Sequence, residues 1–204
     1  MINKSKISVS LIFSMLLCFI YSNGYGQLSS SVDLFGTYSK EISVQKGKKY
    51  LLEKVLKPEE RTKKLEVYGL SAASSGDLTT LIYNATEDED NQGLLLVFYG
   101  NYWNESGVQF QGYDFLNFDT EKAIDFLSTI KTYTELNKDY LKKGSDSNIY
   151  FKYDDLTILA TGNAVTFFDL RILWKDFDLK WEAGSFNRTI KRFEKRLSKF
   201  NKNK

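Results

Sequence analysis

Residues 108–144, VQFQGYDFLNFDTEKAIDFLSTIKTYTELNKDYLKKG, place a strand pattern directly before a helix pattern. In the first part Val108 and Phe110 alternate with polar residues, and the pattern predicts a strand that reaches Phe118. The second part has apolar residues at intervals of three and four, which is the period of a helix. A chain that joins these two patterns is expected to have an α+β fold.

The helix in this stretch is predicted over residues 120–143. Asp119 or Thr120 can cap its first turn, and Gly144 can end it. Its apolar face consists of Ala123, Ile124, Phe126, Leu127, Ile130 and Tyr133. This face is wide enough to pack against a sheet.

Segments on both sides of this stretch are rich in β-branched, aromatic and aliphatic residues and end at turn sequences. Upstream they are Leu65–Ala73, Leu78–Thr86 and Leu94–Tyr99, and downstream they are Ile149–Tyr153, Leu156–Thr161 and Ala164–Trp174. Together they predict a largely antiparallel sheet of about six to eight strands. Two amphipathic helices, at about 120–143 and 185–200, are expected to pack on it.

The segment 36–64 gives mixed signals. Residues 41–45, EISVQ, alternate as in a strand, and residues 50–56 suit either a strand or a helix. Pro58 can open a short helical turn.

The helix predicted at 185–200 has the most regular amphipathic pattern in the chain. Its apolar stripe consists of Phe186, Ile190, Phe193, Leu197 and Phe200. Residues 185–204 also contain eight basic residues and one acidic residue. The stripe predicts packing against the sheet, and the alternative is a helix that lies on an anionic membrane surface.

The first 26 residues predict a cleavable signal peptide. Lys4 and Lys6 precede an apolar run over residues 7–21, and the small residues of Gly24-Tyr25-Gly26 come directly before Gln27. Cleavage before Gln27 would give a secreted or periplasmic protein with a loosely ordered leader at 27–35 and one globular domain at 36–204. The alternative is a lipoprotein acylated at Cys18.

Composition excludes several chemistries. The chain has no histidine, and its one cysteine, Cys18, lies in the predicted signal peptide. Zinc sites of the usual nitrogen and sulfur type and catalytic sets that need histidine are therefore excluded, and no cofactor is predicted. Without Lys4 and Lys6, the 28 basic and 26 acidic residues balance, so we expect no nucleic-acid partner. After the predicted signal peptide no second apolar run of similar length follows, so we expect no transmembrane segment in the mature chain.

Aromatic residues beside amide and carboxylate groups form the predicted binding site. Tyr102 and Trp103 stand among Gly, Asn, Glu and Ser, which predicts an exposed loop, and Tyr99 and Tyr113 lie in the flanking strands. Such side chains can stack on sugars or contact a protein partner, since each has an apolar face and a polar edge. The alternative is that Trp103 folds back over the edge of the sheet.

Two acidic motifs are weaker candidates. Asp88 and Asp90 have the spacing that begins a calcium loop, but the closing glutamate position is Tyr99, so an acidic turn is the simpler interpretation. Asp154 and Asp155 have the composition of a catalytic carboxylate pair, but adjacent strand residues point to opposite faces. A tight turn is therefore predicted there.

The stretch Phe115–Phe200 resembles the layout of small, uncharacterised exported bacterial proteins. The shared features are the LNFDTE sequence at 116–121 before a helix, a hairpin built from NIYFK at 148–152 and LTIL at 156–159, and a closing helix. One position differs: that layout has a second acidic residue where this chain has Thr120. The resemblance implies export and the α+β order, and it implies no activity.

These observations predict an exported, non-catalytic domain that binds a protein or a cell-envelope glycan. Two other classes remain open. A carrier would hold a small apolar ligand in a sheet-lined cavity, and a carboxylate-based hydrolase would need two facing carboxylates in a cleft.

Overall fold

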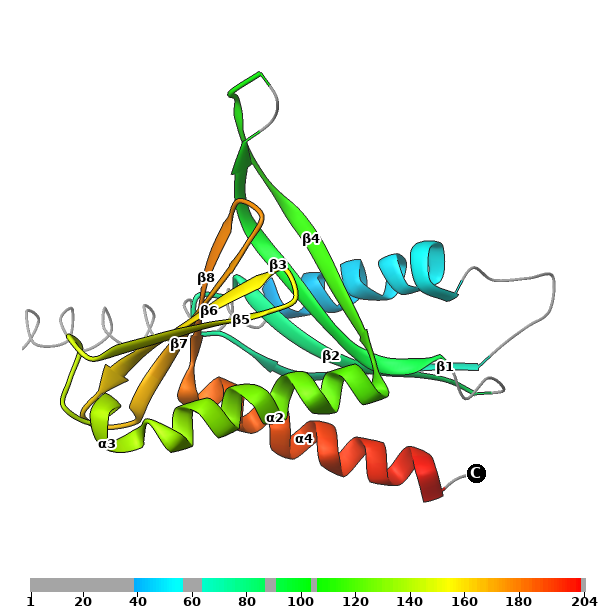
Figure 1. Ribbon diagram of the computed structural model, residues 1–204. Coiled ribbons are helices and arrows are strands. Elements are labelled where there is room, and N and C mark those ends of the chain that lie inside the picture. Colours follow the sequence, from blue (N-terminus) through cyan, green and yellow to red (C-terminus); the bar gives the residue numbers. More distant parts are fainter. Residues whose placement is uncertain (1–38, 57–63, 87–90, 104–105, 203–204) are drawn as a thin grey trace, which may run out of the picture. The chain divides into compact units, whose positions relative to one another are not determined.

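Two meanders of four antiparallel strands, each followed by a helix, account for most of the computed structural model (Figure 1). The structure describes residues 39–56, 64–86, 91–103 and 106–202. Residues 40–204 form one unit, separate from residues 1–39. The predicted signal peptide and the predicted leader at 27–35 lie outside the described residues.

The first meander, here called sheet A, has the strand order β1-β2-β3-β4. Its strands are β1 (Lys64–Ala72), β2 (Leu78–Thr86), β3 (Gln92–Trp103) and β4 (Gln109–Asp119). Two helices follow it, α2 (Thr120–Leu136) and α3 (Lys138–Leu141). As predicted, Asp119 caps α2, because its carboxylate accepts a hydrogen bond from the backbone amide of Lys122 at 2.7 Å.

The second meander, sheet B, has the strand order β5-β6-β7-β8. Its strands are β5 (Asn148–Tyr153), β6 (Leu156–Asn163), β7 (Phe167–Trp174) and β8 (Phe177–Glu182), and α4 (Ala183–Lys202) follows. The predicted α+β class is confirmed, with eight strands among the described residues. These strands form two sheets, and β8 was not among the predicted segments.

A helix precedes sheet A where a strand was predicted. Residues 39–50 are α-helical and continue into the π-helical segment η1 (Leu51–Leu56), and we call this element helix 39–56. The prediction of a strand at 41–45 is therefore wrong. Five alternating residues cannot exclude a helix, and here Val44, Gly47 and Leu51 lie on one helical face against sheet A.

Sheet A is covered on both faces, which explains the uninterrupted apolar run from Leu94 to Phe98. Leu95 and Val97 pack toward helix 39–56, whereas Leu94, Leu96 and Phe98 belong to the main core with α2, α4 and sheet B. A strand that is buried on both faces has no polar side to alternate with.

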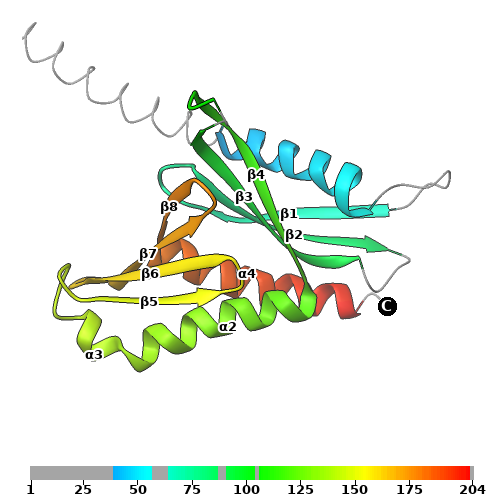
Figure 2. The ribbon, with the colours of Figure 1, turned by 45° about the horizontal axis from the view of Figure 1, so that its top comes forward.

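Helix α4 joins the two sheets, because it contacts β1 and β2 of sheet A and also β7 and β8 of sheet B (Figure 2). Phe186, Phe193 and Phe200 are buried in the main core, and Ile190 and Leu197 are partly buried against it. The predicted packing of this stripe on a sheet is confirmed. None of the helices in the described part of the chain has the length and apolar character that a bilayer crossing requires.

The helix predicted over 120–143 is interrupted near its end. Asn137 stands between α2 and α3, and its side-chain amide donates a hydrogen bond to the backbone carbonyl of Tyr133 at 2.9 Å. Asparagine favours such local bonds over a continuous helix. Gly144 then follows with φ +129°, as expected for a residue that ends a helix.

Candidate functional site

The candidate site lies where sheet A narrows from four strands to two. The pairing of β2 with β3 ends at Phe98, and beyond the hydrogen bond from the Tyr99 amide to the Asp77 carbonyl at 2.7 Å, residues 100–103 of β3 pair only with β4. Figure 1 shows the resulting β3–β4 hairpin extending beyond the other strands. At its base Tyr99 pairs with Tyr113, and their ring centroids are 4.7 Å apart.

Aromatic rings continue from this pair along β4 to helix 39–56. Phe115 follows Tyr113 on the same face, with ring centroids 6.4 Å apart. Tyr50 of the helix stacks on Phe115 at 4.6 Å, with an angle of 13° between the rings. Because Tyr50 stands on the helix and the other three rings stand on the sheet, the row closes the junction between these two elements.

The helix can approach the sheet closely because its contact residue is a glycine. A Cβ atom added at Gly47 would lie 2.4 Å from Cδ1 of the buried Leu81, so a larger residue would require Leu81 or the helix to shift. This close contact fixes the position of the helix next to the hairpin.

These elements enclose a groove of about 670 Å³, which we call the aromatic groove. Its lining consists of Lys46, Lys49, Tyr50, Glu53, Lys54, Tyr99, Gln111, Gly112, Tyr113 and Phe115. The four rings form an apolar floor, and charged and amide side chains stand around it. The volume is in the range of small-molecule sites.

The surroundings of Tyr113 favour its neutral form further. Partial burial raises the pKa of the Tyr113 hydroxyl above its ordinary value, a hydrogen bond with Ser43 acts in the opposite direction, and the neighbouring Tyr99 raises the pKa again. At neutral pH Tyr113 therefore keeps its proton. A protonated phenol can donate a hydrogen bond to a ligand as well as accept one.

The structure brings together two of the four predicted binding residues, Tyr99 and Tyr113. Tyr102 and Trp103 were predicted in a loop, but this is wrong, because the backbone of β3 continues to Trp103 and pairs there with Gln109 of β4. The turn signal in residues 104–107 marks only the tip of the hairpin. The side chains of Tyr102 and Trp103 lie outside the described structure.

Sequence reasoning missed the half of the groove that helix 39–56 provides. Tyr50, Lys46 and Lys54 became candidates only when the segment proved to be helical. Apolar residues at 44, 51 and 55 have the spacing of one helical face, and this was the signal that could have revealed them.

The structure describes no metal site at the acidic residues that the sequence singled out. Asp88 and Asp90 lie outside the described residues. Within the described ranges no group of three or more Asp, Glu, His or Cys side chains is placed to hold a metal ion. Asp154 and Asp155 form the predicted tight turn between β5 and β6, where Asp154 has φ +49° and its carboxylate pairs with Lys122.

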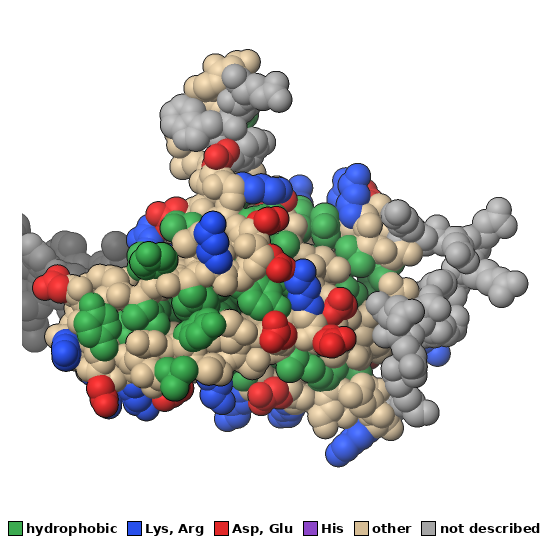
Figure 3. Space-filling model, in the orientation of Figure 1, with side chains coloured by type: hydrophobic (Ala, Val, Ile, Leu, Met, Phe, Trp, Pro, Cys, Tyr) green, Lys and Arg blue, Asp and Glu red, His purple; other side chains and the backbone are tan. Residues whose placement is uncertain are grey.

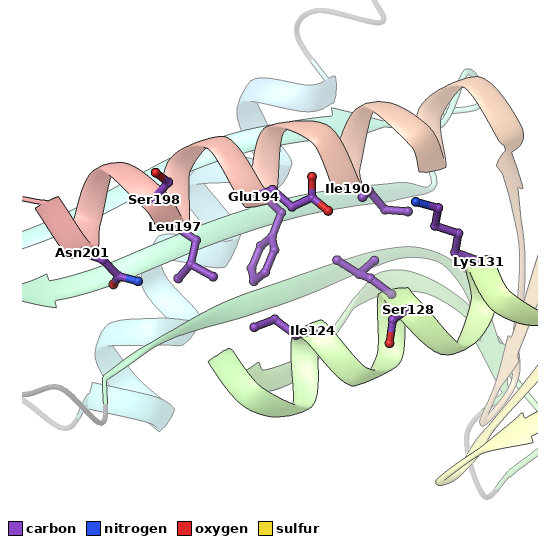
Figure 4. Close-up of a pocket in the computed structure, with 10 residues that line it drawn as sticks. Ile124, Ser128, Lys131, Ile190, Glu194, Leu197, Ser198 and Asn201 are labelled. Carbon is purple, nitrogen blue, oxygen red and sulfur yellow. The ribbon is translucent and has the colours of Figure 1, made fainter.

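A second groove, of about 440 Å³, lies between α2 and α4 (Figure 4). Its apolar lining consists of Ile124, Leu127, Ile190, Phe193 and Leu197. Its polar lining consists of Ser128, Lys131, Glu194, Ser198 and Asn201. Figure 4 shows Ile124 of α2 and Leu197 of α4 projecting into the gap between the helices.

Hydrophobic side chains also form a row across the face that carries α2 and β5 (Figure 3). The most exposed of the large apolar side chains in these elements are Leu136 and Tyr150, at 76% and 79%. Neither of them lines either of the two grooves.

Comparison of the chain with protein-family models, with curated proteins and with solved structures gives no match.

Proposed function

We propose that this protein is an exported, non-catalytic binding domain that holds a glycan of the cell envelope in the aromatic groove. The observation that supports this most strongly is the row of four rings, Tyr99, Tyr113, Phe115 and Tyr50, on the floor of a groove with polar walls. A pyranose ring has an apolar face of C–H groups and an edge of hydroxyl groups. Aromatic rings pack against the C–H face of the sugar, and amide or charged side chains form hydrogen bonds with its hydroxyl groups.

A glycan fits these features better than a folded protein partner does. Protein interfaces of standard size bury about 800 Å² on each partner and centre on well-packed anchors. The aromatic groove is instead a narrow feature with its rings half-buried in its floor. A protein partner would also be expected to contact the exposed rim of the hairpin.

The proposal is tested by titrating the purified domain, without residues 1–26, with chitohexaose and with hexagalacturonate in a calorimeter. At least one of these hexasaccharides should bind, and Tyr113→Ala should weaken that binding about tenfold, a loss of roughly 1.4 kcal/mol. Tyr150→Ala is the matched control, because Tyr150 is an exposed tyrosine on sheet B, outside the groove. Absence of binding by both sugars, or equal loss in both variants, would reject the proposal.

A carrier of a small apolar ligand is the second candidate function, and the α2–α4 groove is the observation that favours it. Five apolar side chains line this groove, and it is smaller than the aromatic groove. A fluorescent fatty acid should then bind, and Ile124→Asp should abolish the binding. An unchanged affinity in this variant would remove the carrier from consideration. The third class, a carboxylate-based hydrolase, stays a prediction from sequence.

Export is part of the same proposal. The order of Lys4 and Lys6, an apolar run and a small-x-small site before Gln27 supports cleavage at that residue. N-terminal sequencing of the protein recovered from the producing cells should begin at Gln27. A mature protein that begins with a lipid-modified Cys18 would instead establish the lipoprotein alternative.

A further inference from the structure

The charges around the aromatic groove are not balanced. Three lysines and one glutamate line it, and Lys49 pairs with Glu53, with Nζ and Oε1 3.5 Å apart. Lys46 and Lys54 have no carboxylate partner among the described residues. Both lysines are exposed and line the groove, so their ammonium groups are available to pair with an anionic ligand there.

Lys46 also lies near the row of rings. Its ammonium group lies over the Tyr113 ring, 5.9 Å from the centroid. A lysine at this distance keeps its charge close to the rings and can move toward an acidic group of a ligand that contacts them. The lysine and the tyrosine can then contact one ligand together.

Acidic side chains from the neighbouring strands do not cancel this charge. Asp114 is next to Tyr113 in sequence, but its side chain pairs with Lys175, which lies in the turn between β7 and β8, at 2.6 Å. Adjacent strand residues point to opposite faces of a sheet, so Asp114 faces sheet B while Tyr113 faces the groove. Glu53 is the one acidic residue in the lining.

We infer that the ligand of the aromatic groove is an acidic saccharide, whose carboxylate or phosphate group pairs with Lys46 and Lys54 while its ring stacks on Tyr99 and Tyr113. This inference rests on the proposed function. It specifies the class of glycan, because three lysines and one glutamate line the groove and an anionic group would gain from this excess of positive charge, whereas a neutral sugar would not. An acidic peptide would pair with the lysines but would make little use of the row of rings.

The test compares hexagalacturonate, which is acidic, with chitohexaose, which is neutral, on three variants. Lys46→Gln with Lys54→Gln should weaken binding of the acidic sugar roughly fivefold, since exposed charge pairs are modest in strength. Glu53→Gln should strengthen binding of the acidic sugar, because it removes the acidic residue of the lining. Lys191→Gln with Lys195→Gln removes the same charge from the exposed side of α4 and should leave the affinity unchanged.

Salt gives a second, independent measurement. Binding of hexagalacturonate should weaken as ionic strength rises, because exposed charges are screened over about 10 Å at 0.1 M salt. Binding of chitohexaose, where it is detectable, should not change.

The outcomes separate the two proposals. If both sugars bind equally and depend on Tyr113, the groove binds glycans and the preference for acidic sugars is rejected. If neither sugar binds, the proposed function fails as well. If hexaglutamate displaces hexagalacturonate at equal concentration, the site recognises charge alone and the saccharide inference is overturned.

Discussion

Sheet A and sheet B are both meanders of four antiparallel strands, but they differ in how many of their faces are covered. Sheet A lies between helix 39–56 on one face and the main core on the other. In sheet B, the strands β6, β7 and β8 alternate between buried and exposed or half-buried residues. The open face of sheet B carries ion pairs such as Arg171 with Asp178, at 2.8 Å.

This difference indicates where a ligand site can form. The open face of sheet B carries exposed ion pairs and is solvated. In sheet A, the hairpin of β3 and β4 continues beyond the part of the sheet that helix 39–56 covers, and the half-buried rings of Tyr99, Tyr113 and Phe115 lie beside this helix. The aromatic groove lies at this position.

The largest effect is expected at the helix that the two sheets share. Phe193 of α4 is 2% exposed in the main core, so Phe193→Ala should cost about 3–5 kcal/mol of unfolding free energy. Lys195→Ala, on the exposed side of the same helix, is the control and should be nearly neutral. Urea unfolding followed by circular dichroism measures both variants. If Phe193→Ala and Lys195→Ala had the same free energy of unfolding, α4 would not be an essential part of the core.

A smaller effect distinguishes the two sheets from each other. Leu95 of sheet A is fully buried under helix 39–56, and Leu95→Ala should cost about 2–5 kcal/mol. Leu159 occupies the open face of sheet B, and Leu159→Ala should cost less than about 1 kcal/mol. Similar losses of unfolding free energy in the two variants would show that the sheets are equally covered.

The smallest effect concerns the turn between β1 and β2. Burial raises the pKa of the Asp77 carboxyl above its ordinary value, a hydrogen bond with Ser75 opposes this shift, and the nearby Glu182 adds to it. The fold therefore disfavours ionised Asp77, and this penalty grows as pH rises through the folded-state pKa. Asp77→Asn removes the penalty.

Asp77→Asn should therefore raise the melting temperature at pH 7, with a gain under about 1 kcal/mol because the group is partly exposed. The gain should vanish as pH falls below the ordinary pKa of 3.8, where both states are protonated. Thermal melts at pH 3 and pH 7 provide the measurement. A lower melting temperature at pH 7 would mean that the ionised carboxylate stabilises the turn.

Most strands could be predicted from the sequence because their signals are local. The segment predicted at 78–86 coincides with β2, and the cap at Asp119 and the glycine at 144 were both recognised. Helix 39–56 was missed, because the helical spacing of Val44, Leu51 and Val55 is sparse and its partner surface on sheet A comes later in the chain. The short alternation at 41–45 favoured a strand, whereas packing against sheet A stabilises the helix.

The division into two sheets also depends on long-range contacts. At Gly100 a Cβ atom would lie 3.2 Å from Cδ1 of Phe177, so this glycine lets β3 pass close to β8. Phe98 packs there on Trp174, with ring centroids 4.8 Å apart. The aromatic groove was predicted only in part for a similar reason. Tyr99 and Tyr113 lie in one hairpin, so a local pattern brings them together. Tyr50 reaches them only through the packing of helix 39–56 on sheet A.

The most direct test of the account is to map bound hexagalacturonate by NMR, following the backbone amides of the domain as the sugar is added. The account predicts shifts at residues 46–54, at Tyr99 and at residues 111–115, and no change at Tyr150 or Arg171 on the open face of sheet B. Shifts confined to sheet B, or to α2 and α4, would contradict the assignment of the site to the aromatic groove.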